Sequence, residues 1–427
     1  MAKKTKAWAA IISMIALFAM IAFVTNLCSP MAVIVKNEFG ASNFLAQIGN
    51  YGNFGAYLIM GLPSGMLIKK YGYKNTALIA LIVGIIGVLV QWVSGSLGFG
   101  VYLIGALISG ACMCMLNAVV NPMLNLLGGG GNKGNQLIQI GGVFNSAAAV
   151  AIYIIMGALI GDATKAHISD ATPALMIALA IFVVAFIIIF FTKIDEPEQA
   201  IETESQIELI EGACRYRHFL LGVLAIALYG AVEVGPPTYI LQYLTSSPDA
   251  STPGLGMDAG YCGTLGAVYF LMMLVGRFLG GVIGGKVSTK AMIASVASVA
   301  IVLIGIGIFI PTEIRISIPG INWVTLKLVW GQVPVGVFLF LLVGLCASVM
   351  WGGIFNLATE GLGKYTAIAS GIFMAAVSGF AISVGLQGLV ADLTGNFLIS
   401  FLVPLSAAAY ILYYALIGSK PVVKSNN

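Results

Sequence analysis

Apolar runs of about 20 residues recur along the whole chain, and this repetition limits the possible folds more than any other feature. A run of that length lets an α-helix cross the hydrocarbon core of a bilayer. Transmembrane β-strands are about 10 residues long and alternate in polarity, so they do not fit these continuous runs. Only 8% of the 427 residues are charged, against about a quarter in soluble domains. The sequence therefore predicts an all-α membrane protein.

Twelve apolar runs can be separated, and each is predicted to form one membrane-spanning helix. A cleaved signal at the N-terminus is not expected, because the first run is too long and eleven spans follow it. The loop at 311–331 alternates in polarity and predicts a short hairpin on the outer side. The predicted spans are Trp8–Val35, Leu45–Ile68, Asn75–Val93, Val101–Leu127, Gln136–Ile160, Thr172–Phe191, Phe219–Leu244, Gly260–Gly284, Ala291–Pro311, Gly331–Leu357, Ile368–Val390 and Phe397–Ile417.

Lysine and arginine residues predict how the chain crosses the bilayer. With twelve spans and a cytoplasmic N-terminus, 16 of the 20 basic residues fall on the inner side, and the other 4 are Lys36, Lys165, Arg315 and Lys327. Basic residues favour cytoplasmic loops, so we expect both termini in the cytoplasm and the chain in the inner (plasma) membrane. The net charge of +4 reflects this bias and indicates no nucleic-acid partner.

The longest polar stretch, residues 193–217, divides the spans into six and six. We therefore expect an N-terminal six-helix bundle over residues 1–192, a cytoplasmic linker over 193–217 and a C-terminal six-helix bundle over 218–427. The linker is predicted to be solvated and partly helical, with a regulatory contact as the alternative. Glycine-led basic turns, Gly65–Asn75 and Gly280–Ala291, occupy corresponding places in the two halves. Such parallel repeats are common in secondary transporters, whose halves rock about a site near the midplane.

Metal, cofactor and catalytic sites are not expected from the sequence. The six cysteines show neither a disulfide framework nor zinc spacing, and His167 and His218 stand alone in loops. No metal and no cofactor are therefore predicted. The spans contain no paired catalytic carboxylates and no nucleophile motif, so an enzyme is not expected.

Glu233 is the one acid that the sequence places deep within a span. It lies fourteen residues after Phe219, which corresponds to about 21 Å at about 1.5 Å per residue. Burial disfavours the charged form of a carboxyl group, and ionisable groups inside a membrane are often proton relays. We predict that Glu233 couples proton movement to transport; a permanently neutral carboxyl bonded to a neighbouring helix is the alternative. Pro236 and Pro237 predict a break in this helix.

Seven short motifs are spread in order over most of the chain: GMLIKKYGYK (65–74), NAVVNPMLNLLG (117–128), FNS (144–146), YGAVEVGPPTY (229–239), GRFLGG (276–281), GLGKYT (361–366) and GLVADLTGN (388–396). The first resembles the loop motif of the major facilitator superfamily, in which Gly65, Lys70, Gly72 and Lys74 fit and Lys69 replaces an acid. The ordered set resembles the fucose–galactose–glucose:proton symporter group. The resemblance implies two pseudo-symmetric six-helix bundles (the major facilitator fold) and sugar transport by alternating access.

Amides and aromatic rings in the spans suit a neutral sugar. An amide both donates and accepts hydrogen bonds, and a mostly apolar pocket with an aromatic face fits a sugar ring. The resemblance places Asn26 and Asn145 at sugar-site asparagines of the group, and Trp351 at an aromatic position. Hydrogen bonding between helices is the alternative use of the amides. The predicted substrate-binding residues are Asn26, Asn117, Asn121, Asn145, Tyr239, Trp351 and Gln387.

An asparagine stripe runs along the fourth span, because Asn117, Asn121 and Asn125 lie at i, i+4 and i+8. The best-known member of the resembled group carries coupling acids at positions that align with Ser29 and Asn117, and both residues are uncharged here. The coupling residues of the group therefore cannot be transferred to this chain. Proton coupling through Glu233, sodium coupling and no coupling remain alternatives.

Lys70 and Arg277 are predicted to act in gating at the inner face, Arg277 within a charge network near the inner end of its span. Glu360 and Asp392, which lie near span ends, are interpreted in the same way. The predicted function is that of a monomeric secondary transporter in the lipid bilayer, which moves a small neutral sugar (a monosaccharide or short glycan) together with a proton. A facilitator of another polar metabolite and a sugar-binding membrane sensor are the alternatives.

Overall fold

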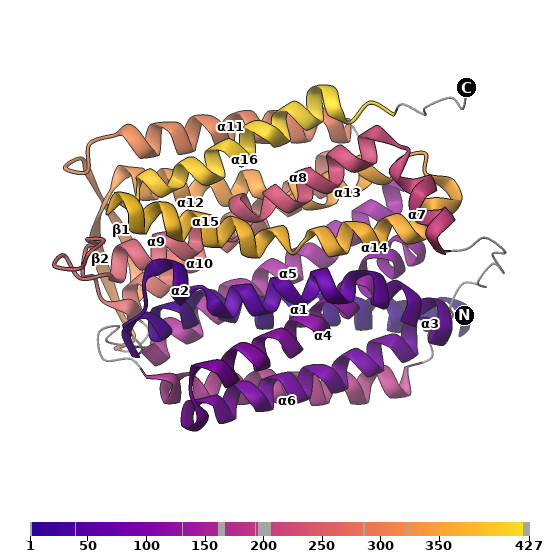
Figure 1. Ribbon diagram of the computed structural model, residues 1–427, viewed down its shortest axis with the longest axis horizontal. Helices are drawn as coiled ribbons and strands as arrows, with labels where there is room; N and C mark the ends of the chain where they lie inside the picture. The colour runs from indigo at the N-terminus through magenta and orange to yellow at the C-terminus, as the bar shows by residue number, and fades with distance from the viewer. Residues whose placement is uncertain are drawn as a thin grey trace.

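The computed structural model describes residues 2–38, 40–129, 131–160, 167–192, 194, 206–284, 287–322 and 325–421 of the chain. These residues form long helices and one small sheet (Figure 1). The first half contains α1 (Ala2–Glu38), α2 (Asn43–Ala46), α3 (Ile48–Leu97), α4 (Phe99–Leu127), α5 (Gly131–Ile160) and α6 (Thr172–Phe191). The second half contains α7 (Gln206–Cys214), α8 (Arg217–Glu233), α9 (Gly235–Thr245), α10 (Ala259–Ile283), α11 (Thr289–Phe309), β1 (Arg315–Asn322), β2 (Lys327–Pro334), α12 (Val335–Ala347), α13 (Met350–Thr359), α14 (Thr366–Ala376), α15 (Gly379–Thr394) and α16 (Leu402–Tyr413).

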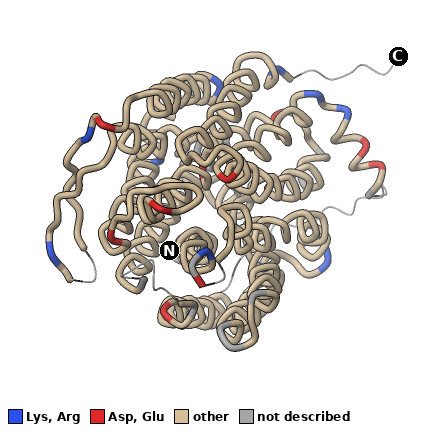
Figure 2. The backbone as a smooth tube through the Cα atoms, turned by 60° about the vertical axis from the view of Figure 1, so that its left-hand side comes forward, with Lys and Arg blue, Asp and Glu red and all other residues tan. Residues whose placement is uncertain are grey.

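Eleven helices within the described ranges are long and apolar enough to cross a membrane, and charged residues are sparse along them (Figure 2). One of the eleven, Ile48–Ser94, has 47 residues, about twice the length that a span requires. It is interrupted at Gly72, whose φ of 81° and ψ of 172° are not helical. Glycine adopts such a positive φ without the steric cost of a side chain. Counted as two spans joined at Gly72, this helix brings the described total to the predicted twelve.

Several spans of the second half are broken along their length. α8 ends at Glu233 and α9 begins at Gly235, with Pro236 and Pro237 in its first turn. Proline fits this position, because the N–H groups of a first turn have no partner within the helix. The predicted break at the two prolines is therefore confirmed. Further breaks separate α12 from α13 and α14 from α15.

Tyrosine side chains satisfy backbone carbonyls at these breaks. The Tyr269 hydroxyl donates a hydrogen bond to Val232 O at 2.5 Å, and the Tyr229 hydroxyl donates to Ala347 O at 3.0 Å. A helix end leaves its last carbonyl groups without helical partners, and no water replaces them in the apolar part of a bilayer. The two tyrosines therefore stabilise broken helices at a depth where such ends are otherwise costly.

The two halves of the chain lie side by side, and Figure 1 shows the first half, in indigo to magenta, below the second half, in rose to yellow. Small residues bring their backbones together. A Cβ built on Gly157 of α5 would lie 2.9 Å from Gly263 Cα of α10, and one built on Gly61 of α3 would lie 2.6 Å from Ala375 N of α14. Close contact between small residues is a common way for membrane helices to pack. These two seams hold the halves together.

The two ends of the molecule carry different segments. The chain termini and α7 lie at one end, and α2 and the hairpin lie at the other (Figure 1); we call these the termini end and the hairpin end. Strands β1 and β2 pair antiparallel, with Arg315 opposite Pro334, which confirms the predicted hairpin. Within the predicted linker, residues 193 and 195–205 lie outside the described residues, whereas 206–214 form α7.

Candidate functional site

A cavity with about 560 Å³ of empty space lies between the two halves, and we call it the central cavity. Its wall includes side chains of α1, α3, α4 and α5 from the first half and of α8, α10, α13 and α15 from the second. The predicted substrate residues Asn26, Asn117, Asn145 and Trp351 line it, and so does Glu233. Residues far apart in the sequence are thus brought to one place that both halves enclose.

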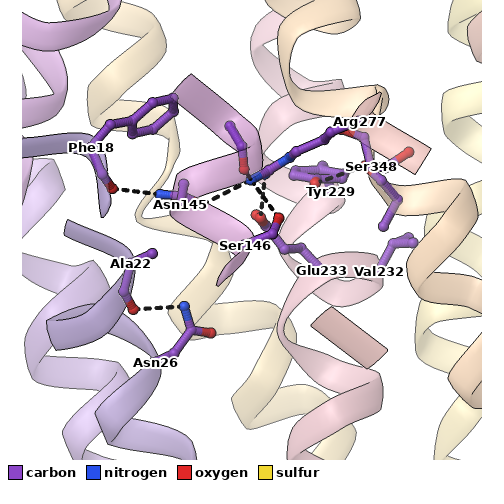
Figure 3. A network of polar contacts seen from close by, with 12 residues as sticks. Phe18, Ala22, Asn26, Asn145, Ser146, Tyr229, Val232, Glu233, Arg277 and Ser348 are labelled. Atoms are coloured by element: carbon purple, nitrogen blue, oxygen red, sulfur yellow. Dashed lines mark hydrogen bonds and ion pairs between the residues drawn. The ribbon is translucent and has the colours of Figure 1, made fainter. Parts of the chain in front are cut away.

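Arg277 and Glu233 form an ion pair in the wall of the central cavity. Arg277 Nη2 lies 3.6 Å from Glu233 Oε1, and the side chains are only 7% and 19% exposed. Figure 3 shows the Arg277 side chain reaching toward Asn145 and Ser146, with Glu233 beside it. The break after Glu233 helps to place its carboxyl group here, because α8 ends at this residue.

Arg277 also binds the first half of the chain. Its Nη1 donates to Gly142 O at 2.8 Å, to Asn145 Oδ1 at 2.8 Å and to Ser146 Oγ at 3.0 Å. Arg277 belongs to α10 and the three acceptors belong to the adjacent α5, so the guanidinium joins the two halves in the wall of the central cavity. The Nε group donates a longer hydrogen bond of 3.4 Å to Ser348 O, at the break between α12 and α13.

This arrangement lets Glu233 change its charge while Arg277 keeps its hydrogen bonds. Arginine remains charged at any physiological pH, and a buried charge without partners is strongly destabilising. Burial opposes the ionised form of Glu233, whereas the neighbouring Arg277 favours it. If Glu233 takes up a proton, the α5 acceptors still satisfy the guanidinium. The pair can therefore act chemically as a proton-dependent contact.

The amides around the cavity differ in how much of their hydrogen-bonding capacity is used. Asn145 Nδ2 donates to Phe18 O at 2.9 Å, so with Arg277 on its oxygen both ends are engaged. Asn26 Nδ2 donates to Ala22 O of its own helix at 2.8 Å, which leaves its oxygen to accept from a ligand. Asn145 therefore positions other groups, while Asn26 retains an acceptor for a ligand.

The span-four amides are connected to each other and to Tyr57. Asn117 Nδ2 donates to the Tyr57 hydroxyl at 2.8 Å. Asn121 Nδ2 donates to Asn117 O at 3.0 Å and lies 3.4 Å from Asn117 Oδ1. The Asn117 amide group is thus held in place at the cavity wall by residues on both sides of it.

An aromatic wall completes the cavity, and sequence reasoning identified only its tryptophan. The ring centroids of Trp351 and Phe380 lie 6.1 Å apart, and those of Phe54 and Phe380 lie 5.1 Å apart. Tyr229 packs against Trp351 at 6.3 Å. Phe54 comes from α3 and the others from the second half, so the wall crosses between the halves. Phe380 lies directly after the break between α14 and α15. Nothing in the sequence marks this break, so the place of Phe380 in the wall could not be predicted.

Comparison with known proteins identifies the family. Residues 13–420 match the family model described as the Major Facilitator Superfamily. The chain belongs to the major facilitator superfamily. The resemblance inferred from the motifs is confirmed at this level, together with the twelve-helix architecture of the superfamily.

Individual relatives of this superfamily member cover almost its whole length. The chain is 30% identical over 420 residues to a glucose/galactose transporter of Brucella abortus biovar 1 (strain 9-941), covering 96% of this chain and 94% of the relative. It is 22% identical over 430 residues to an L-fucose-proton symporter of Escherichia coli (strain K12), covering 93% and 90%. The crystal structure of the superfamily transporter FucP in the outward conformation is similar with a TM-score of 0.72 at 21% identity, covering 96% of this chain and 98% of that one.

Three predicted substrate residues of this superfamily member do not line the central cavity. Tyr239 is buried and donates its hydroxyl hydrogen to Val384 O at 2.7 Å. Gln387 is also buried, with Nε2 3.5 Å from Ser400 Oγ. Both side chains pack inside the second half, because α9 and α15 direct them toward other helices of that half. Asn121 lines a second cavity, nearer the termini end.

Two charged residues lie elsewhere than the sequence indicated. The sequence predicts Arg277 in a network at the inner face, but its guanidinium lines the central cavity because the long side chain extends from α10 to α5. The sequence predicts the same for Asp392, but this residue lies at the hairpin end, where it accepts from Asn43 N and Phe44 N of α2 at 3.1 and 2.9 Å. Lys70 is exposed, 5.0 Å from the Tyr71 ring centroid, and its predicted gating role stays a prediction.

Polar contacts between the halves close the hairpin end. Lys36 Nζ of α1 donates to Ser246 Oγ of the second half at 3.0 Å, and within its own half it donates to Asn43 Oδ1 of α2 at 2.7 Å. Ser29, at one of the positions aligned with a coupling acid, lies 2.7 Å from Thr238 as measured between their hydroxyl oxygens. Together with the contacts of Asp392, these bonds join α1 and α2 to the second half. The structure therefore represents a state in which the halves are in contact at this end.

Proposed function

We propose that this protein is a secondary active transporter that moves a small neutral sugar across the inner membrane by alternating access, with proton symport. The observation that carries the proposal is the central cavity, which both halves line with amides, aromatic faces and one buried ion pair. The relatives named as a glucose/galactose transporter and an L-fucose-proton symporter support it.

The lining of the central cavity favours a neutral polyol over other solutes. The Asn26 oxygen can accept from a hydroxyl group, and the wall formed by Phe54, Trp351 and Phe380 offers faces for the apolar side of a sugar ring. Arg277 and Glu233 carry opposite charges. The lining of the cavity therefore has no net charge when Glu233 is ionised. A monosaccharide or short glycan is the ligand class that this chemistry supports best.

Proton coupling is proposed to operate through the contact between Glu233 and Arg277. Ionised Glu233 attracts Arg277 from within the second half, and Arg277 binds Asn145 of the first half. Uptake of a proton by Glu233 removes that attraction and changes how firmly the guanidinium is held between the halves. The protonation state of Glu233 thereby biases the movement of one half against the other, and release of the proton resets it.

The proposed topology follows from where the segments lie. The N-terminus, the C-terminus and α7 share one end, which we propose to be cytoplasmic, with bundles of residues 1–192 and 218–427 moving about the linker 193–217. Lys70 is proposed to act in gating at that face. We propose that the transporter works as a monomer in the bilayer, since both halves of the cavity come from one chain.

Uptake into proteoliposomes tests the proposal. Labelled glucose, galactose and fucose are supplied with and without an inward proton gradient. We expect the gradient to drive accumulation of at least one sugar in wild type. Glu233→Gln should abolish this accumulation but keep exchange of labelled for unlabelled sugar, because the amide cannot cycle a proton. The matched control is Glu313→Gln, which changes an exposed acid and should behave as wild type.

The other outcomes point to specific alternatives. Equal uptake with and without the gradient overturns proton coupling and indicates an uncoupled facilitator, whereas stimulation by a sodium gradient alone indicates sodium coupling. Sugar binding without uptake of any kind indicates a membrane sensor.

A further inference from the structure

A second cavity, with about 540 Å³ of empty space, lies between the halves on the side of the termini end. Its lining includes Asn121 and Asn125 of α4 and Trp351, Asn356 and Thr359 of α13. Its place along the molecule follows from α13, which ends at Thr359. The next turn, Gly363–Tyr365, packs its tyrosine ring against Gly212 of α7, and α7 lies at the termini end. Within the described residues, no acidic or basic side chain lines this cavity.

The asparagine stripe of α4 connects the second cavity with the central one. Asn117 lines the central cavity, whereas Asn121 and Asn125 line the second. Successive members are four residues apart, which is about 6 Å along a helix. Trp351 lines both cavities, so one aromatic side chain stands between them. The stripe thus provides a continuous row of amides past the tryptophan.

The amides of the second cavity have unused acceptor capacity. Asn125 Oδ1 is buried and, among the described residues, has no hydrogen-bond partner. Asn121 uses its Nδ2 group to donate to Asn117, which leaves its own oxygen as an acceptor. A buried polar atom without a partner is costly, so this arrangement favours a ligand that brings hydrogen-bond donors. Hydroxyl groups of a neutral sugar are such donors, while an anion is not.

We propose that this second cavity is a sugar subsite on the path between the central cavity and the termini end, with Trp351 as the partition between the two sites. The sugar passes the tryptophan and exchanges the hydrogen bonds of Asn117 for those of Asn121, Asn125 and Asn356. This inference rests on the proposed transport of a neutral sugar. It assigns Asn125 and Asn356 to substrate binding on one face of the membrane, which the central site does not require.

The test compares transport from the two faces of the membrane. Initial rates of D-glucose and D-galactose entry are measured in right-side-out and inverted vesicles that contain the full chain. Asn125→Leu removes the amide from the subsite. We expect the KM to rise about three- to tenfold for sugar entering from the termini face, as for the loss of one neutral hydrogen bond. For sugar entering from the hairpin face, the KM should stay unchanged.

Two further variants separate a binding effect from a folding defect. Asn356→Leu changes an exposed residue of the other half and should shift the same KM on the same face. The matched control, Asn75→Leu, alters an exposed asparagine outside both cavities and should leave both KM values unchanged. A folding defect would lower the maximal rate from both faces and would not produce the one-sided shift.

Each remaining result overturns the inference in a recognisable way. A KM unchanged on both faces would mean that the cavity is only a water-filled vestibule. An equal rise on both faces would assign Asn125 to the central site. If wild-type vesicles transport neither sugar from either face, the proposed function fails, and the subsite fails with it; wild-type transport that Asn125→Leu leaves unaffected overturns the subsite alone.

Discussion

At the scale of single residues, the contact between Arg277 and Glu233 decides what the central cavity can do. The guanidinium has acceptors on α5 at 2.8 to 3.0 Å and a carboxylate at 3.6 Å. The hydrogen bonds to α5 are shorter than the distance to Glu233, so the carboxylate is the partner more easily lost. A proton on Glu233 therefore affects the ion pair first and leaves the link to the first half in place.

Removing one member of this pair should cost more than removing both. Arg277→Met leaves Glu233, which is 19% exposed at the cavity wall, without its partner, and we expect the free energy of unfolding to fall by up to about 3 kcal/mol, the low end for a broken buried pair. The double variant Arg277→Met, Glu233→Gln should recover part of that loss, because no unpaired charge remains. Thermal unfolding of the purified proteins in detergent measures both. A double variant as unstable as the single one would show that the two residues do not stabilise each other.

The sequence predicted which kinds of side chain form the site better than it predicted which of them line the central cavity. Glu233 is identified because an acid inside an apolar run is conspicuous, whereas Asn26 and Asn145 are identified through the resemblance to the symporter group. Tyr239 and Gln387 are equally conspicuous, yet both face other helices of their own half. A polar residue can face either the other half of the chain or the helices of its own half. Tertiary packing decides between these two orientations, and the sequence does not show which one is adopted.

At the scale of helices, the breaks and turns control where side chains point. The joint between spans two and three is the single residue Gly72, with φ 81° and ψ 172°. This conformation lies in a region that is essentially restricted to glycine. The sequence indicated a turn between these spans, but not that the helix continues directly on both sides of one residue.

Gly72→Ala should therefore destabilise the fold, whereas Gly65→Ala should not. We expect Gly72→Ala to lower the free energy of unfolding by about 1–3 kcal/mol, since a side chain is strained at this φ and ψ. Gly65 is helical, and a Cβ built on it would meet no atom within 4 Å, so an alanine there should be neutral or stabilising by about 0.5–1 kcal/mol. Thermal unfolding in detergent compares the two. Equal stability of both variants would mean that the joint at residue 72 tolerates another conformation.

The breaks in the second half could be predicted only where proline marks them. Pro236 and Pro237 indicated the break between α8 and α9, and the alternation of polarity indicated the hairpin. The breaks between α12 and α13 and between α14 and α15 have no proline at the junction. They are stabilised by contacts such as Tyr229 with Ala347 O, which form only after distant helices have packed.

At the scale of the whole molecule, transport by alternating access requires the two halves to separate at the hairpin end. In the structure they are in contact there through Ser29 and Thr238, whose hydroxyl oxygens lie 2.7 Å apart on α1 and α9. The central cavity lies between the same two halves. A sugar that enters from the hairpin face must therefore pass through a region that is closed in this state.

A reversible cross-link between these two positions should stop transport. In a chain whose native cysteines are replaced, Ser29→Cys and Thr238→Cys place two sulfur atoms close enough to form a disulfide. We expect oxidation to abolish sugar uptake into proteoliposomes and reduction to restore it, because the bond holds the halves together at the hairpin end.

The control is a pair of cysteines within the first half, made by Ser64→Cys with native Cys114 retained. In the wild type, Ser64 Oγ lies 3.8 Å from Cys114 Sγ. Oxidation of this pair should leave uptake intact, since it ties no half to the other. If the cross-linked Ser29–Thr238 variant still transports sugar, the halves do not part at this contact and the substrate reaches the central cavity by another route.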